Sequence, residues 1–119
     1  MKYLSLIFIS AYLSIFPTLS EARTTEKLAK QCVGSGALES DQIFCAGYID
    51  GFLDSHAIIS GLHESTKLFC LPKSGISIDQ ALLIFLEYVN KNPKSFDKTA
   101  RVTLTMSLIK SFPCPTPKK

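Results

Sequence analysis

The spacing of apolar positions predicts helices along the chain. Apolar side chains recur every three or four residues, and no stretch alternates with period two for long enough to indicate a sheet. The first predicted helix covers residues 25–32, with Thr24 as its N-cap. The second begins at a cap formed by Ser40 or Asp41, and Gly61 ends it.

Two further helices follow in the second half of the chain. The third has the strongest start signal, because Ser77 with Gln80 three residues later forms a capping box. It ends at the sequence Asn-Lys-Asn-Pro, since proline disfavours the α conformation in the residue before it. The fourth begins near Ser95 or Asp97 and runs into the Phe-Pro-Cys sequence at 112–114. We therefore expect an all-α, small four-helix bundle-like domain.

The first 22 residues have the pattern of a secretory signal peptide. A basic residue precedes the apolar stretch 3–16, and Ser20 and Ala22 occupy the −3 and −1 positions of a cleavage site. The apolar stretch is shorter than the ~20 residues that a spanning helix needs. We expect cleavage of residues 1–22, no stable membrane insertion afterwards, and one exported domain over residues 23–119.

The chain has four cysteines, an even count that predicts two disulfides in an exported protein. We expect Cys32–Cys45, across the short connection between the first two helices, and Cys70–Cys114, at one end of the hairpin formed by the last two. The alternative pairing, Cys32–Cys114 with Cys45–Cys70, requires residues 61–69 to run back along the second helix and remains open. No C-x-x-C pair occurs, so we expect neither structural zinc nor any other cofactor.

Charge and motifs argue against nucleic-acid binding and against catalysis. The net charge is +3, but the basic residues are scattered and no basic run contains aromatic residues. Asp50 and Asp54 share one helix face, and two nearby carboxylates can divide acid and base roles. His56 lies on another side of that helix, and no nucleophile, zinc-protease or phosphate-loop motif is present. We expect no catalytic site and no metal site.

A row of small residues on the second helix predicts close packing instead. Gly47, Gly51 and Ser55 recur every four positions beside Tyr48, a pattern that lets another helix approach closely. In a soluble helix we interpret it as a tight internal crossing. A neighbouring stripe at helical spacing is predicted to face the core; it consists of Cys45, Ile49, Phe52, His56 and Ile59.

Several motifs in order resemble the Rap/Tai family of type VI secretion amidase immunity proteins. They are "CAGYIDGFLDSH" from residue 45, "FCLP" at 69–72, the step from Pro93 to Ala100, and "FPC" at 112–114. The resemblance implies a helical, disulfide-bonded periplasmic protein, commonly a homodimer, that binds a peptidoglycan amidase and blocks its active-site cleft. The residues that carry it look like scaffold positions: Cys45, Gly47, Tyr48, Gly51, Cys70, Pro72, Phe112, Pro113 and Cys114.

Two connections are candidates for contact with such a partner: residues 61–69, the first connection, and residues 90–97, the second connection. The candidate contact residues are Glu64, Ser65 and Lys67 in the first and Lys91, Asn92 and Lys94 in the second. If neither connection binds, the face around Asp50 and Asp54 is the next candidate. The alternative function is a small helical periplasmic stress protein or chaperone, which would expose apolar surface under stress.

Overall fold

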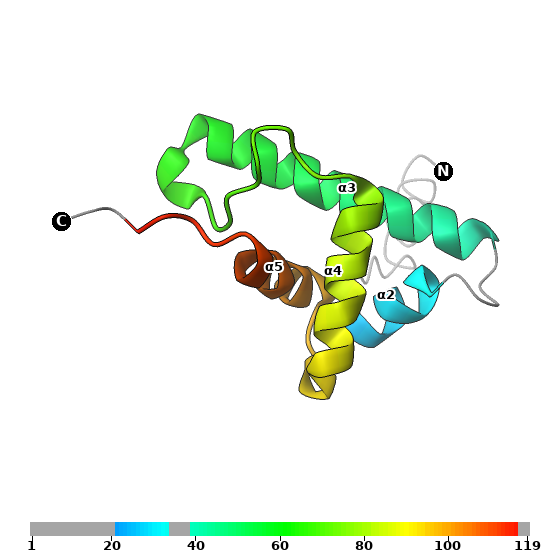
Figure 1. Cartoon of the computed structure of the whole chain (residues 1–119). Coiled ribbons are helices and arrows are strands. Elements are labelled where there is room, and N and C mark those ends of the chain that lie inside the picture. Colours follow the sequence, from blue (N-terminus) through cyan, green and yellow to red (C-terminus); the bar gives the residue numbers. More distant parts are fainter. Residues whose placement is uncertain (1–20, 34–38, 117–119) are drawn as a thin grey trace, which may run out of the picture.

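The computed structural model describes residues 21–33 and 39–116. Most of the expected signal peptide, residues 1–20, lies outside this range. The described part contains four α-helices, α2 (Thr25–Cys32), α3 (Glu39–Leu62), α4 (Ile78–Lys91) and α5 (Ala100–Ser111), and two short 3-10 helices, η1 (Glu64–Thr66) and η2 (Pro93–Ser95). In Figure 1 the long α3 lies across one side of the molecule, and the other three helices gather against it. The all-α, four-helix prediction is confirmed.

Local sequence signals place two of the helix starts correctly. The hydroxyl of Thr24 accepts a hydrogen bond from the backbone N–H of Lys27 at 3.3 Å, which caps α2. The capping box of α4 is complete, because the Gln80 N–H donates to Ser77 Oγ at 3.1 Å and the Ser77 N–H donates to Gln80 Oε1 at 2.9 Å.

The bounds of α3 differ from the prediction at both ends. The helix is already formed at Glu39, before the caps expected at Ser40 or Asp41, and it continues through Gly61 to Leu62. A glycine terminates a helix well when it takes a positive φ. Among the described residues only Gly75 has that conformation, at φ 70°. Gly61 therefore remains helical, and it weakens the last turn without ending it.

The start of α5 also differs from the prediction. The helix begins at Ala100, not near Ser95 or Asp97. Thr99 instead forms an isolated antiparallel bridge with Thr24, and the Ala100 N–H donates to the backbone just before this bridge at 2.8 Å. Pairing with a segment some 75 positions away thus decides where α5 starts.

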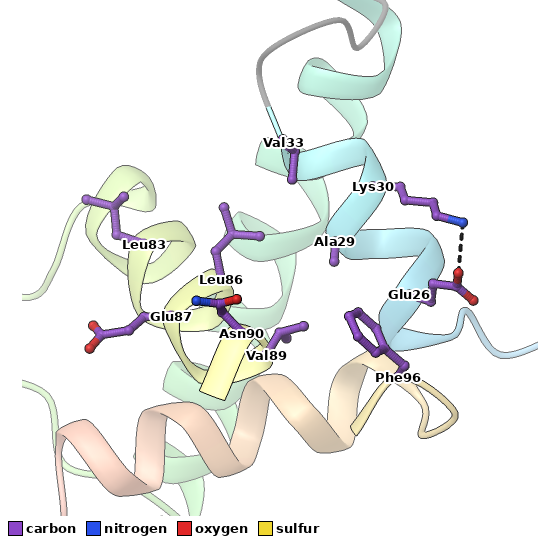
Figure 2. Close-up of a pocket in the computed structure, with 10 residues that line it drawn as sticks. All are labelled: Glu26, Ala29, Lys30, Val33, Leu83, Leu86, Glu87, Val89, Asn90 and Phe96. Carbon is purple, nitrogen blue, oxygen red and sulfur yellow. Dashed lines mark hydrogen bonds and ion pairs between the residues drawn. The ribbon is translucent and has the colours of Figure 1, made fainter. Parts of the chain in front are cut away.

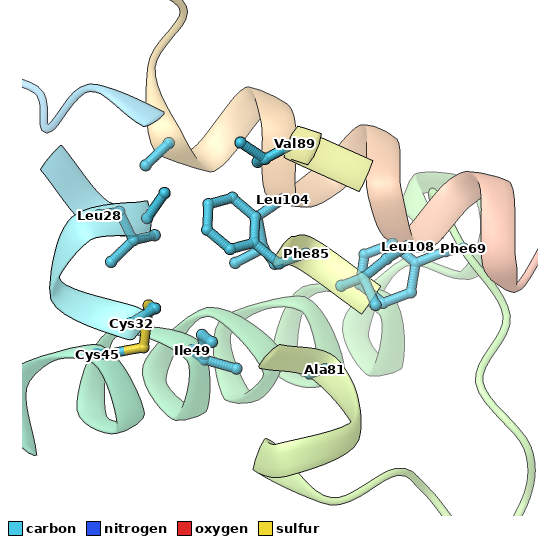
Figure 3. Packing of buried hydrophobic residues seen from close by; sticks show 12 residues of the cluster. Leu28, Cys32, Cys45, Ile49, Phe69, Ala81, Phe85, Val89, Leu104 and Leu108 are labelled. Atoms are coloured by element: carbon cyan, nitrogen blue, oxygen red, sulfur yellow. A yellow bond between two sulfur atoms is a disulfide. The ribbon is translucent and has the colours of Figure 1, made fainter. Parts of the chain in front are cut away.

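The core lies where α2, α4 and α5 meet the first half of α3 (Figure 3). Its completely buried apolar side chains are Leu28, Ile49, Phe69, Ala81, Phe85, Ala100, Leu104 and Leu108. The stripe predicted on α3 is buried at Cys45 and Ile49 and half-buried at Phe52 and His56. Its last member, Ile59, is 53% exposed, so that part of the prediction is wrong. The second half of α3 extends beyond α4 and loses the cover of the other helices (Figure 1).

Both predicted disulfides are present, and the alternative pairing is not formed. Cys32–Cys45 joins the end of α2 to α3, and Cys70–Cys114 joins the segment before α4 to the segment after α5. The Cys70 N–H also donates to the carbonyl of Phe112 at 2.9 Å. The first connection therefore starts from α3 and is fixed at its far end to the end of α5.

Candidate functional site

The first connection is exposed except at its last residue, Phe69, which is buried in the core. Residues 61–68 are all exposed, and the candidate contact residues Glu64, Ser65 and Lys67 lie in and beside η1. The hydrogen bonds of η1 are local: the Lys67 N–H donates to the carbonyl of Glu64 at 3.1 Å, and the Thr66 hydroxyl donates to that of His63 at 2.6 Å. The three candidate side chains thus lie together on a protruding turn.

Large apolar side chains surround this turn. They come from the last turns of α3 and from the loop, and we call them the α3 tip: Ile58, Ile59, Leu62 and Leu68. Leu62 is 73% exposed and is the most exposed large apolar residue in the described part of the chain. Sequence reasoning missed the α3 tip, because these positions continue the apolar spacing of the helix beyond the point where the core ends.

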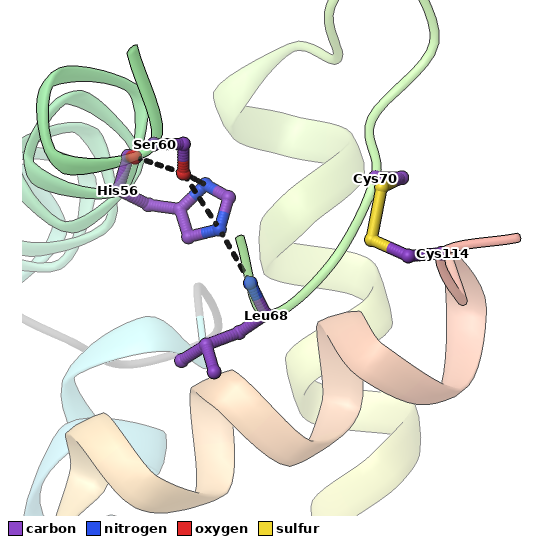
Figure 4. Close-up of a disulfide and its surroundings, with 5 residues drawn as sticks. All are labelled: His56, Ser60, Leu68, Cys70 and Cys114. Carbon is purple, nitrogen blue, oxygen red and sulfur yellow. Dashed lines mark hydrogen bonds between the residues drawn. A yellow bond between two sulfur atoms is a disulfide. The ribbon is translucent and has the colours of Figure 1, made fainter. Parts of the chain in front are cut away.

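One side chain of α3 fastens the first connection to the helix (Figure 4). The imidazole of His56 stacks on the buried ring of Phe69, with ring centroids 3.7 Å apart and planes inclined by 12°. Its Nε2 accepts a hydrogen bond from the backbone N–H of Leu68 at 3.3 Å. Burial lowers the pKa of His56 below its ordinary value of 6.5, and the charge of Lys67 lowers it further. His56 is thus the half-buried, hydrogen-bonded histidine that the helical stripe predicted.

The second connection is tied into the fold. The side-chain amide of Asn92 donates to the carbonyl of Tyr88 at 2.8 Å, and Lys91 is paired with Glu87 one turn earlier on α4. Lys94 is exposed and makes no ion pair or hydrogen bond with any residue that the structure describes. Of the three candidate contact residues here, only Lys94 is therefore unengaged.

An open groove between α2 and α4 has a volume of about 800 Å³ (Figure 2). The exposed side chains of Val33, Leu83 and Phe96 line it together with charged residues of the two helices. We call it the α2–α4 groove. The sequence carries a signal for it, because the run from residue 82 to residue 86 is apolar all round the helix and one side must then face away from the core.

The row of small residues on α3 does not form the internal helix crossing that we expected. Gly47, Gly51 and Ser55 are exposed, and no atom of the described chain lies within 4 Å of a Cβ built at either glycine. The Ser55 hydroxyl donates to the carbonyl of Gly51 within its own helix, at 2.7 Å. Tyr48 beside them is half-buried against the core, which raises the pKa of its phenol, while Arg101 and Arg23 partly oppose that rise.

The carboxylates of α3 show no catalytic arrangement. Asp50 and Asp54 are exposed, and neither makes a hydrogen bond or ion pair within residues 21–33 and 39–116. Over the same ranges, no three histidine, cysteine, aspartate or glutamate side chains come close enough to hold a metal ion. No helix in the described part of the chain is both long and apolar enough to span a membrane.

These features define a class: a small all-α, disulfide-bonded domain whose exposed loop and apolar surfaces are suited to binding another protein. Residues 24–114 match the family of Rap1a immunity proteins, and the chain belongs to that family. This confirms the resemblance found in the motifs. Immunity proteins are non-catalytic. Comparison with curated proteins and with solved structures finds no match.

Proposed function

We propose that this chain is a periplasmic immunity protein that binds a peptidoglycan amidase effector of a type VI secretion system and blocks its active-site cleft. The observation that carries the proposal is the family match over residues 24–114, which spans both disulfides and all four helices. An immunity protein acts by binding a cognate toxin, so the functional part of the molecule is a protein-binding surface.

Export to the periplasm is supported by the disulfides and by the start of the folded region. Disulfides form and persist in oxidising compartments. Arg23 is the residue that would follow signal cleavage, and its carbonyl accepts the hydrogen bond from Ala100 while its guanidinium lies 4.1 Å from the ring centroid of Phe44. Cleavage after Ala22 would leave these contacts intact. Intact-mass analysis of protein from the periplasmic fraction is expected to give an N-terminus at Arg23. Full-length protein retained in the cytoplasm would overturn this part of the proposal.

The first connection is the better candidate for the inhibitory surface. A protein that plugs a cleft needs a protruding element on a rigid base, and residues 61–68 are exposed while Cys70 is anchored by its disulfide. The α3 tip adds apolar area at the same place, and the buried centre of a protein interface is more apolar than its rim. Lys67 can pair with an acidic rim, which mainly raises the association rate.

Two triple variants test this choice against an amidase effector that the parent protein binds. We expect Glu64, Ser65 and Lys67 all changed to alanine to weaken binding at least ~10-fold, as loss of about 1.4 kcal/mol does. The matched variant with Lys91, Asn92 and Lys94 changed to alanine should bind with an affinity within about threefold of the parent, since Lys91 and Asn92 are engaged within the fold and Lys94 lies outside the proposed contact surface. Binding would be measured by calorimetry, and equal losses of affinity in both variants would contradict the choice of loop.

The alternative function, a periplasmic chaperone, has a different signature. Failure of the parent protein to bind any amidase, together with acid-dependent protection of unfolded client proteins from aggregation, would favour it.

We further propose that the protein is a homodimer and that the α2–α4 groove is its interface. The groove exposes Leu83, at 66%, together with Val33 and Phe96. Two such grooves facing each other would bury these side chains symmetrically. Light scattering is expected to give a dimer for the parent and a monomer for Leu83→Glu. A monomeric parent would rule out the dimer, and a dimeric Leu83→Glu would place the interface elsewhere.

A further inference from the structure

We infer that His56 is a positioning residue whose neutral form fastens the first connection to α3, and that acidification releases residues 63–68 from the helix. This inference goes beyond the proposed function and does not depend on which partner the protein binds. It rests on contacts that converge on one imidazole from two segments of the chain.

The first step concerns the contacts that hold the segment. Among the described residues, the hydrogen bonds of residues 63–67 run within the segment or to Ile59 at the end of α3. The Leu68 N–H donates to His56 Nε2 at 3.3 Å (Figure 4). The Phe69 ring stacks on the imidazole, with planes inclined by 12°. His56 is therefore the side chain of α3 that contacts the end of the first connection, at Leu68 and Phe69.

The second step concerns the protonation state that this geometry requires. Nε2 can accept the Leu68 N–H only through its free lone pair, so the ring is neutral and carries its proton on Nδ1. Ser60 Oγ lies 3.3 Å from Nε2 and 3.5 Å from Nδ1, and its own hydrogen is donated to the carbonyl of His56 at 2.6 Å. Protonation of Nε2 would place two N–H groups against each other and remove the hydrogen bond to Leu68.

The charges around the ring favour the same state. Lys67 is the charged group on the loop whose field acts on His56, and it opposes a second positive charge there. Asp54 on α3 and Glu64 on η1 make no hydrogen bond with the ring. The face of Phe69 attracts a cation weakly, but burial and Lys67 prevail, so the pKa of His56 lies below 6.5.

Linkage gives the direction of the pH effect. Because the pKa is lower in the folded protein than in the unfolded chain, the unfolded chain binds more protons in this range. The stabilisation from His56 is fully present above pH 6.5 and is lost as the pH falls through the lowered value.

The extent of the release follows from the two ends of the segment. At one end α3 continues to Leu62, and at the other the Cys70–Cys114 disulfide and the Cys70 to Phe112 hydrogen bond do not titrate with His56. Opening is therefore confined to residues 63–68, which include Lys67 and the exposed Leu68, while Phe69 stays buried in the core.

Nuclear magnetic resonance of the disulfide-bonded protein tests the inference without any partner. We expect the His56 ring resonances to titrate below the ordinary histidine value. The amide of Leu68 should lose about tenfold in protection from hydrogen exchange, after correction for intrinsic rates, as the pH falls from about 7 to about 5. His56→Phe keeps a ring to stack on Phe69 but removes the acceptor, so Leu68 should be poorly protected at both pH values.

His63→Gln is the matched control, because His63 lies in the same loop and its exposed side chain makes no hydrogen bond within the described residues. It should retain the full pH dependence of Leu68 protection. Unchanged Leu68 protection across the titration of His56, or parent-like protection in a folded His56→Phe, would overturn the inference. If His56→Phe does not fold, the protection of the Leu68 amide in the parent protein, measured across the titration of His56, is the deciding test. None of these readouts involves an amidase, so failure here is distinguishable from failure of the proposed function.

Discussion

The two connections of this protein looked equivalent as candidate contact loops, but they are held in different ways. In the second connection, η2 closes on itself through hydrogen bonds from the N–H and the hydroxyl of Ser95 to the carbonyl of Asn92, at 2.9 and 2.7 Å. The carbonyls of Phe96 and Lys98, which follow η2, accept hydrogen bonds from the first turn of α2. The first connection has local hydrogen bonds and one histidine contact to the helix before it.

The difference is the physical reason for proposing the first connection, and not the second, as the binding loop. Backbone carbonyls that pair with a distant helix fix a turn as part of the scaffold. A turn whose hydrogen bonds are mainly internal leaves its side chains free for a partner. The free energy needed to open such a turn locally is also low. The following changes test this contrast, from the largest expected effect to the smallest.

Removal of the disulfide that anchors the first connection should have the largest effect. Replacing Cys70 and Cys114 by serine opens a loop of 44 positions, which corresponds to ~4 kcal/mol of unfolding free energy in the chain-entropy account. The matched change at Cys32 and Cys45 opens 13 positions and should cost ~3 kcal/mol. Urea denaturation of both variants measures the difference, and a larger loss for the shorter loop would contradict the ranking.

Disruption of the polar contact beneath the second connection should cost less. Thr25 is completely buried, donates to the carbonyl of Lys98 at 2.9 Å and lies 2.8 Å from the hydroxyl of Thr103. Thr25→Val removes the hydroxyl partner of the buried Thr103, while the Lys98 carbonyl keeps the hydrogen bond from the backbone N–H of residue 25. We expect a loss of about 1–3 kcal/mol in unfolding free energy. Thr105→Val is the control, because that hydroxyl bonds only within α5, to Arg101. Equal denaturation midpoints for the two variants would show that the buried contact has no special role.

Substitution in the row of small residues should have a smaller effect of opposite sign. Gly51 is helical and exposed, with open space around it, so Gly51→Ala should raise the unfolding free energy by about 0.5–1 kcal/mol. If another chain packs closely on this row, the same change should weaken that association. Thermal unfolding of the isolated protein and binding to its partner separate the two outcomes.

The surface ion pair next to the second connection should have the smallest effect. Lys91 and Glu87 are both largely exposed, and the salt bridge lowers the pKa of the Glu87 carboxyl through its hydrogen bond to Lys91. Exposed ion pairs of this kind contribute little to the unfolding free energy, because water and salt screen the attraction. Lys91→Ala should leave both the melting temperature and the affinity for an amidase unchanged, whereas Lys67→Ala should reduce the association rate. A clear loss of affinity in Lys91→Ala would show that the second connection is part of the binding surface.

The sequence by itself determined the helical class and two of the helix starts, and it favoured the disulfide pairing that the structure contains. These depend on short-range physics: the capping geometry of Thr24, Ser77 and Gln80 is complete within one helical turn. The cysteine pairs followed from which helix ends a short chain can bring together, and the order of the motifs identified the family.

Tertiary structure decided which of the predicted faces are covered. Ile59 continues the apolar spacing of α3 but is exposed, because the other helices end before it. Gly47 and Gly51 have the spacing of a packing groove, yet no helix in the described part of the chain lies there. The start of α5 depends on pairing with the segment just before α2. The end of the second connection is held by hydrogen bonds from the first turn of α2. Periodicity shows that a helix has distinct faces, but only the positions of the other helices determine which face loses its contact with water.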